Sequence, residues 1–454
     1  MKGLLLIYLI VGLGCVAALW RPAIGLYVYI FLGVLRPKYM WGFAGNLNSM
    51  SDYVGTAMLL GWAIHGFGSH RPQKGRFPIY AAGVFLLWTI LSATQALDKA
   101  VAFAPLPDFL KILLPCLVGV TMMGTTQRVR HIMWIIVGAQ AYVCLELNLN
   151  YVIDGDNRVA TLGYGGLDNN AYGVNLLATL GAAFVLPLTT RNWIERGLGA
   201  AAAVLILHTI LLTFSRGAFI GLMAAGVAAF MFMPKQPRNL AALALVVLLV
   251  VRLIGPELAT RYSTSFNQRG ELDYAATSRL DLWERMFAVA LTVPVFGVGP
   301  DNWPVVAQDY GFPPGKHGHS LWVQTLVEIG FPGVLALAAM YLGCIAQLWG
   351  FSIRHRKTER DAAVLAAGLI VSLVAYVISA QFVTLQRLEI PFYMVMAGVL
   401  LMNKKDSAVV AAVPAPKRGP LIPSTKVLPA MGRQSAPPYA ARSGTSVFSR
   451  GTKQ

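Results

Sequence analysis

The chain has 454 residues, of which 56% are hydrophobic and only 13% are charged. Soluble domains carry about 25% charged residues, and a single core cannot hold this much apolar side chain, so the composition excludes a soluble globular protein. The net charge of +17 would indicate nucleic-acid binding in a soluble protein. Here much of the excess lies in short connectors and in the C-terminal tail, where basic residues mark cytoplasmic segments. We therefore expect no nucleic acid as a partner, while a positive surface for an anionic substrate stays open.

Apolar runs long enough to cross a bilayer recur along the chain. About 20 apolar residues span the hydrocarbon layer, and backbone groups there must be paired within their own segment, so we predict an all-α polytopic membrane protein. The run 23–35 is short and follows the helix-breaking pair Arg21-Pro22, and we interpret it as a broken or tilted piece. This leaves about 12 transmembrane helices. The runs are 3–20, 23–35, 52–67, 78–94, 109–124, 131–148, 171–189, 198–214, 217–233, 239–255, 320–348, 362–385 and 390–402.

Arginine and lysine gather in every second connector, which orients the spans because such connectors stay in the cytoplasm. The first two of the opposite connectors, 95–108 and 149–170, carry little basic charge. Another of them, 256–319, is about 64 residues long. We predict a transmembrane domain over residues 1–402, with both termini cytoplasmic and the large loop 256–319 on the outer side. The basic positions are Arg71, Lys74, Arg76, Arg128, Arg130, Arg191, Arg196, Lys235, Arg238, Arg354, Arg356, Lys357, Arg360, Lys404 and Lys405.

Residues 403–454 have a different composition from the rest of the chain. They contain seven prolines, many small and basic residues, a single acidic residue, Asp406, and no apolar period. Such a segment cannot bury enough apolar surface to offset its chain entropy. We predict a disordered basic cytoplasmic tail that can contact anionic lipid.

The loop 256–319 is long enough to carry function, since loops of this length are functional or disordered. Ser278, with Asp281 at the third following position, is expected to cap a helix. This pattern predicts an amphipathic helix that lies on the bilayer or folds over a cavity, followed by a glycine-rich turn from Pro294 to Pro300. The apolar residues at helical spacing are Leu280, Trp283, Phe287 and Leu291.

His319 is the first candidate for chemistry. It directly precedes Ser320, which is expected to cap the next helix. The positive end of a helix dipole disfavours imidazolium and keeps the ring neutral, as a general base requires. The alternative interpretation is a loop histidine at the level of the lipid headgroups.

Arg216 is the second candidate, because it lies between two apolar runs with almost no room for a loop. An arginine at a membrane face is costly without a partner, so it either reaches phospholipid headgroups or binds a phosphate of a substrate. Arg279, at the start of the loop helix, is a further group of the same kind. Two arginines and a neutral histidine suit a lipid pyrophosphate leaving group.

Asp154-Gly155-Asp156 is a D-x-D sequence on the outer side, and such pairs can hold a divalent metal. Aspartate and glycine are also the residues that a turn requires, and we favour the turn. The stretch from Gly166 to Asn170 is typical of a helix cap. Since no phosphate-binding loop, dinucleotide fingerprint or zinc motif is present, we expect neither a metal nor a cofactor.

In their order and spacing, these motifs resemble the O-antigen ligase and polymerase superfamily, the Wzy-C or WaaL-like family. The chain is most similar to the O-glycosylation ligases associated with exosortase systems, over roughly residues 1–400. The motifs that carry the resemblance are Phe214-Ser215-Arg216-Gly217, Ser278-Arg279-x-x-x-Trp283 leading to Gly297-x-Gly299, His319-Ser320 followed by Leu326-x-Glu328-x-Gly330-x-x-Gly333, Arg21-Pro22-x-x-Gly25, Trp41-Gly42-Phe43 and Asp168-Asn169-Asn170.

The resemblance implies a GT-C-type glycosyltransferase in the bacterial inner membrane, with its active site facing the periplasm. Its donor would be a glycan, the O-antigen, on undecaprenyl pyrophosphate, and its expected acceptor a hydroxyl of lipid A-core. Arg216 and Arg279 would hold the pyrophosphate, and His319 would act as the base, without a metal. Many members of the family have His-Asn where this chain has His319-Ser320, which affects local orientation rather than the base.

Other functions remain as alternatives at this stage. A protein hydroxyl would make the chain an O-oligosaccharyltransferase, and a growing glycan would make it an O-antigen polymerase. A lipid or solute transporter is the alternative from a different class, and it requires ionisable residues within the spans. Glu146 and Glu328 are the acidic candidates within them, too few for a proton relay.

Overall fold

The structure is a computed structural model that describes residues 2–41, 47, 49–253 and 274–403. This part of the chain is almost entirely helical, and within it the only bridge between extended residues is an isolated one between Tyr164 and Leu167. The first residues of the predicted loop, up to 273, lie outside the described residues. So does the predicted tail from residue 404 onward.

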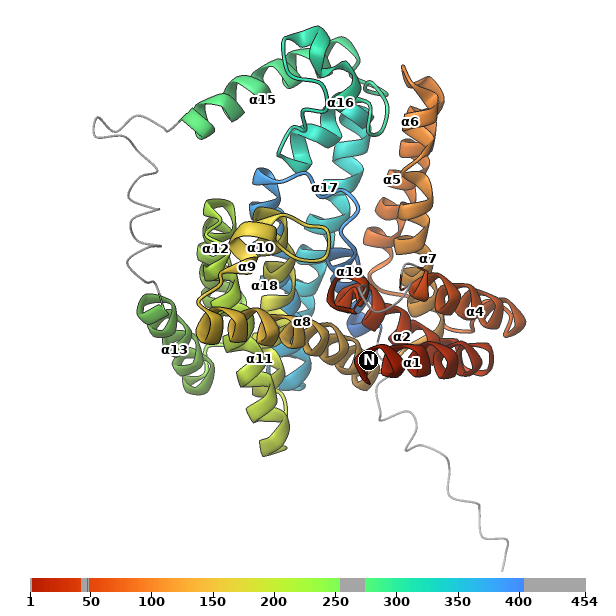
Figure 1. Cartoon of the computed structure of the whole chain (residues 1–454). Coiled ribbons are helices and arrows are strands. Elements are labelled where there is room, and N and C mark those ends of the chain that lie inside the picture. The colour runs from red at the N-terminus through yellow and green to blue at the C-terminus, as the bar shows by residue number, and fades with distance from the viewer. Residues whose placement is uncertain (1, 42–46, 48, 254–273, 404–454) are drawn as a thin grey trace, which may run out of the picture. The chain divides into compact units, whose positions relative to one another are not determined.

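The helices coincide with the apolar runs that the sequence predicts (Figure 1). The first half contains α1 (Lys2–Trp20), α2 (Pro22–Leu35), α3 (Lys38–Trp41), α4 (Met50–Ile64), α5 (Arg76–Gln95), α6 (Lys99–Phe103), α7 (Leu106–Met122), α8 (Thr126–Asp154), α9 (Arg158–Leu162), α10 (Asn169–Val185) and α11 (Trp193–Leu212). The second half contains α12 (Arg216–Phe232), α13 (Pro237–Leu253), α15 (Tyr274–Thr292), α16 (Trp303–Val306), α17 (Leu321–His355), α18 (Arg360–Ser379) and α19 (Glu389–Met402). Short 3₁₀ turns are η2 (Leu186–Leu188), η3 (Ala307–Tyr310) and η4 (Ala380–Phe382).

Within the described ranges, eight helical segments are long and apolar enough to cross a membrane, so the chain is a multi-pass membrane protein. These are Gly3–Trp20, Arg76–Gln95, Lys99–Met122, Thr126–Asp154, Asn169–Leu188, Trp193–Leu212, Leu321–His355 and Arg360–Phe382. Shorter apolar helices are Pro22–Leu35, Arg216–Phe232 and Glu389–Met402. The total of twelve spans and the direction in which they cross stay predictions.

The core of the bundle forms around α18, which packs against α10, α12, α17 and α19. Glycines allow the closest approach: a Cβ atom at Gly181 of α10 would lie 2.2 Å from the carbonyl oxygen of Gly368 in α18. Small residues of this kind let membrane helices gain van der Waals contact where no hydrophobic effect drives them together. In contrast, α5 exposes an apolar stripe with Tyr80, Val84 and Leu87, which is typical of a lipid-facing helix.

Helix α17 is interrupted at Gly330, whose φ and ψ angles are 78° and 179°. The glycine-rich turn that the sequence predicts from Pro294 to Pro300 lies against this break. The amides of Val298 and Gly299 donate to the carbonyls of Val327 and Glu328, each at 2.9 Å. These bonds satisfy carbonyl groups that the interrupted helix would otherwise leave without a partner.

Helix α15 corrects one detail of the predicted loop helix. It begins at Tyr274 rather than after Ser278, so the predicted Ser278 cap is wrong; two alanines, the best helix formers, precede Thr277. Of the predicted apolar stripe, Leu280, Phe287 and Leu291 are about half exposed, while Trp283 is partly buried. A second apolar stripe on the same helix packs instead against Trp303 and the start of α17, and it consists of Leu282, Met286, Val289 and Ala290.

The break in α17 yields a stability prediction. A Cβ atom at Gly330 would lie 2.3 Å from the carbonyl oxygen of Val295, and L side chains are strained at this φ and ψ. Gly330→Ala should therefore lower the free energy of unfolding by at least about 2 kcal/mol, measured as a lower melting temperature in detergent. Gly138→Ala is the control, because a Cβ atom there meets nothing within 4 Å. Equal melting temperatures for the two variants would contradict the strained break.

Candidate functional site

Arg216 is the first residue of α12, directly after a sharp reversal from α11. Phe214 takes a left-handed φ of 51°, and Ser215 caps α12 by accepting a hydrogen bond from the amide of Ala218 at 3.2 Å. Arg216 itself is half-buried. A cation at the positive end of a helix dipole is unfavourable by itself, so an anion beside this arginine would relieve both charges.

The connector before α10 is attached to the same reversal. The side-chain amide of Asn169 donates to the carbonyl of Thr213 at 3.0 Å, and that of Asn157 donates to Leu212, also at 3.0 Å. Asp168 accepts from the amide of Ala171 at 2.7 Å, which confirms the predicted helix cap. These bonds hold Asp168 and Asn169 at the end of the bundle where α12 begins.

His319 lies in a tightly held turn before α17. Its φ angle of 49° is in the left-handed region, which is uncommon for residues other than glycine. The indole of Trp283 donates to the carbonyl of Gly318 at 2.7 Å, and Ser320 accepts from the amide of Val323 at 3.2 Å. The predicted Ser320 cap is therefore confirmed, and His319 is placed at the N-terminus of α17.

The electrostatic surroundings keep His319 neutral. Burial lowers the pKa of its imidazole below the ordinary value of 6.5, and the charges of Arg279, Lys316 and His317 lower it further. Asp168 acts in the opposite direction and raises the pKa. Arg279, Lys316 and Asp168 therefore lie near enough to His319 for their charges to act on its pKa.

The predicted site residues thus come from three separate elements. Arg279 lies on α15, His319 precedes α17, and Arg216 begins α12. Asp168 and Asn169 connect the last of these to the others, because Asn169 binds Thr213 while the charge of Asp168 acts on His319. Sequence reasoning treated Asp168 as a helix cap and as part of a family motif, but it missed the proximity of Asp168 to the histidine, which no local spacing could reveal.

Strained backbone accompanies these residues. Phe214 and His319 both have positive φ, as does Asp301, whose carboxylate accepts from Arg387 at 2.7 Å. Non-glycine residues in this region cost about 1–3 kcal/mol each and persist where the surrounding structure fixes them. Their presence next to Arg216 and at His319 is typical of a functional site.

The D-x-D sequence forms a turn at the end of α8. Gly155 takes a left-handed φ of 68° as the C-cap, and Asp156 pairs with Arg158 at 3.9 Å. Asp154 and Asp156 are both exposed. The preferred interpretation as a turn is confirmed, and among the residues that the structure describes no three His, Cys, Asp or Glu side chains are grouped to hold a metal.

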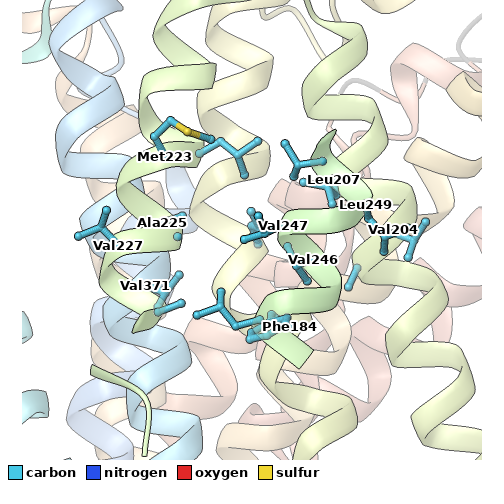
Figure 2. A pocket seen from close by; sticks show the side chains of 18 of the residues that line it. Phe184, Val204, Leu207, Met223, Ala225, Val227, Val246, Val247, Leu249 and Val371 are labelled. Carbon is cyan, nitrogen blue, oxygen red and sulfur yellow. The ribbon is translucent and has the colours of Figure 1, made fainter. Parts of the chain in front are cut away.

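An apolar pocket of about 480 Å³ lies beside α12 (Figure 2). It is lined from α10, α11, α12, α13 and α18, by side chains that include Phe184, Leu207, Met223 and Val246. Met223 and Val227 are 45% and 60% exposed, so the pocket opens sideways from the bundle. On α12 its lining begins at Phe219, one helical turn after Arg216.

Comparison with known families gives one match. Residues 201–338 match the sequence model of a family described as O-antigen ligase. Over these residues the chain is similar to the O-antigen ligase family. The match covers just under a third of the chain and includes Arg216, Arg279 and His319. The O-antigen ligase family comprises membrane glycosyltransferases of the ligase and polymerase type, which use lipid-linked glycans. No curated protein matches the chain.

The electrostatics of His319 can be measured directly. In protein labelled with ¹³C-histidine, the His319 resonance, assigned with a His319→Gln variant, should titrate below the ordinary value of 6.5. Lys316→Gln should raise that pKa, because it removes one of the positive charges that disfavour imidazolium. Lys357→Gln, beyond the opposite end of α17, should leave it unchanged. A wild-type His319 that titrates above the ordinary value would contradict this account.

Proposed function

We propose that the protein transfers a glycan from undecaprenyl pyrophosphate to a hydroxyl group of lipid A-core at the periplasmic face of the inner membrane. The observation that carries the proposal is the place of His319 directly before the N-terminus of α17, where burial and the nearby charge of Arg279 on α15 lower its pKa. Both residues lie in the part of the chain that matches the O-antigen ligase family.

In this proposal His319 removes the proton from the acceptor hydroxyl as its oxygen attacks the anomeric carbon of the glycan. The bond between that carbon and the pyrophosphate oxygen breaks, and the configuration at the carbon inverts. Arg216 and Arg279 stabilise the negative charge that develops on the leaving pyrophosphate. A general base of this kind contributes about 10²–10⁴-fold, and it works at neutral pH because the lowered pKa keeps the imidazole unprotonated.

The apolar pocket supports a prenyl donor. Its lining on α12 runs from Phe219 to Ala229, which lie about 4.5 and 20 Å below Arg216 at 1.5 Å per residue. A lipid whose pyrophosphate lies at Arg216 can therefore place the first part of its chain between α12 and α13. The pocket is almost wholly apolar, as isoprene units require.

The base and the arginines yield one prediction. With undecaprenyl-pyrophosphate-linked glycan and lipid A-core as substrates, His319→Ala should lower the transfer rate of the purified protein by at least about 10²-fold. Arg216→Ala and Arg279→Ala should each lower it by a similar factor, because the leaving group loses a charge partner. Arg356→Ala, at the far end of α17, is the control. Near-normal transfer by His319→Ala would show that the base is assigned wrongly.

The products that form in cells identify the acceptor. In a deletion strain, gel analysis of lipopolysaccharide should show loss of polymer on lipid A-core while the lipid-linked polymer persists. Loss of chain length alone would instead identify a polymerase. Intact lipopolysaccharide with loss of glycan from a secreted protein would identify a protein O-oligosaccharyltransferase.

The pocket yields a second prediction. A Cβ atom at Gly226 meets nothing within 4 Å, and Gly226 lines the pocket, so a phenylalanine side chain at this position can extend into the pocket from an unobstructed Cβ. This variant should raise the KM for an undecaprenyl donor about tenfold and leave a short farnesyl donor unaffected. Gly12→Phe on α1, also in open space, is the control. An equal change for both donors would rule out the pocket as the prenyl site.

A further inference from the structure

Glu328 is a fully buried carboxyl group that the proposed reaction does not use. It lies on α17, two residues before the break at Gly330. Its backbone carbonyl accepts from the amide of Gly299 at 2.9 Å and from the hydroxyl of Ser92 at 3.1 Å. A buried acid is costly unless hydrogen bonds satisfy it, so its position in a rigidly held segment requires an explanation.

A directional chain of hydrogen bonds leads from this carboxyl group to the turn of His319. The amide of Gly318 donates to Oε1 of Gln324 at 2.6 Å. This bond fixes which end of the Gln324 side chain carries the oxygen, so its Nε2 faces Glu328 and donates to Oε1 of that residue. Gln324 and Glu328 are one turn apart on the same face of the helix, and both are buried.

The second oxygen of Glu328 is held from another segment. Nε2 of Gln386, between η4 and α19, donates to Oε2 of Glu328 at 3.1 Å and to the hydroxyl of Thr325 at 3.2 Å. The carboxyl group therefore accepts from two side-chain amides, as well as from the backbone amide of Asp301, and cannot turn away from Gln324 without losing one of these bonds. Both side-chain partners are themselves buried.

The chain of hydrogen bonds ends at the backbone of Gly318. The amide of Gly318 donates to Gln324 at 2.6 Å, and its carbonyl accepts from the indole of Trp283 at 2.7 Å. A Cβ atom at Gly318 would lie 2.6 Å from Met286 and 2.7 Å from Oε1 of Gln324, so this position has no room for a side chain. The next residue is His319, whose left-handed φ needs such support.

We propose that Glu328 is a positioning residue, which sets the orientation of His319 through Gln324 and the Gly318 peptide. The proposal rests on the proposed function of His319 as the base. Glu328 acts as a hydrogen-bond acceptor for Gln324, and its charge is not needed. An amide at position 328 can still accept from Gln324, because Gln386 can reverse its own amide and accept from residue 328 and from Thr325.

The test compares an apolar with a conservative substitution in the full-length protein, with undecaprenyl-pyrophosphate-linked glycan and lipid A-core as substrates. Glu328→Met should lower kcat between about 10- and 100-fold, the loss expected from a misplaced catalytic group, with the KM of the donor unchanged. Glu328→Gln should keep kcat within about threefold of wild type. A fall in kcat for Glu328→Gln as large as for Glu328→Met would show that the charge matters and would overturn the proposal.

A second variant keeps the proposal testable if Glu328→Met fails to fold. Gln324→Met removes the acceptor of the Gly318 amide and should cause the same loss of kcat at unchanged KM. The double variant should lose no more than either single one, because both break one chain. Gln140→Met is the matched control, since Gln140 is equally buried but contacts Tyr172 instead, and it should retain normal kcat.

The outcomes separate this inference from the proposed function. An inactive wild-type protein, or an active His319→Ala variant, would refute the function itself. An active wild-type protein with inactive His319→Ala but normal kcat in Gln324→Met or Glu328→Met would refute only the positioning role. A raised KM of the donor in a folded Gln324→Met or Glu328→Met variant would show that these residues shape the donor site instead of orienting His319, and would also refute the positioning role.

Discussion

The interruption of α17 at Gly330 is the constraint on which the candidate site depends. A continuous helix would hydrogen-bond its own carbonyls and would offer no place for the turn around Gly297 and Gly299. Because the helix stops, the carbonyls of Val327 and Glu328 accept from that turn, and α15 and α16 pack against the first segment of α17. In a bilayer, irregular backbone survives only where protein or water satisfies it. The break thereby converts part of a membrane helix into a base for a folded outer layer.

The charged residues around His319 favour the neutral form of its imidazole. His319 lies among cations, which together with burial lower its pKa, while Asp168 opposes them only in part. The same cations suit a polyanionic leaving group. The same positive charges therefore have two roles in the proposed reaction. They attract the pyrophosphate, and they keep His319 unprotonated so that it can accept a proton.

The sequence was sufficient for those features that depend on one segment alone. Apolar runs predicted the helices because the length of a membrane span is set by the bilayer, and Ser320 and Asp168 were predicted as caps because a cap is local. The Ser278 cap was wrong because the residues before it also favour a helix.

Features that depend on contacts between distant segments could not be predicted. The helix α15 offers two apolar stripes, and only packing against Trp303 decides which is buried. The break at Gly330 lay hidden in a single apolar run, and the proximity of Asp168 to His319 joins residues far apart in the chain. The chain of bonds from Glu328 to Gly318 likewise needs Gln386 from a third segment.

The sideways opening of the pocket beside α12 has a consequence for how a membrane-bound substrate would be exchanged. Met223, Val227 and Val247 line the pocket and are also exposed on the outside of the bundle. A lipid can thus slide in from the bilayer, and a spent carrier can slide out, without separation of the packed helices α10 and α18. Encounters would then occur within the plane of the membrane, so that turnover would depend on the amount of carrier per unit of membrane area rather than on its concentration in solution.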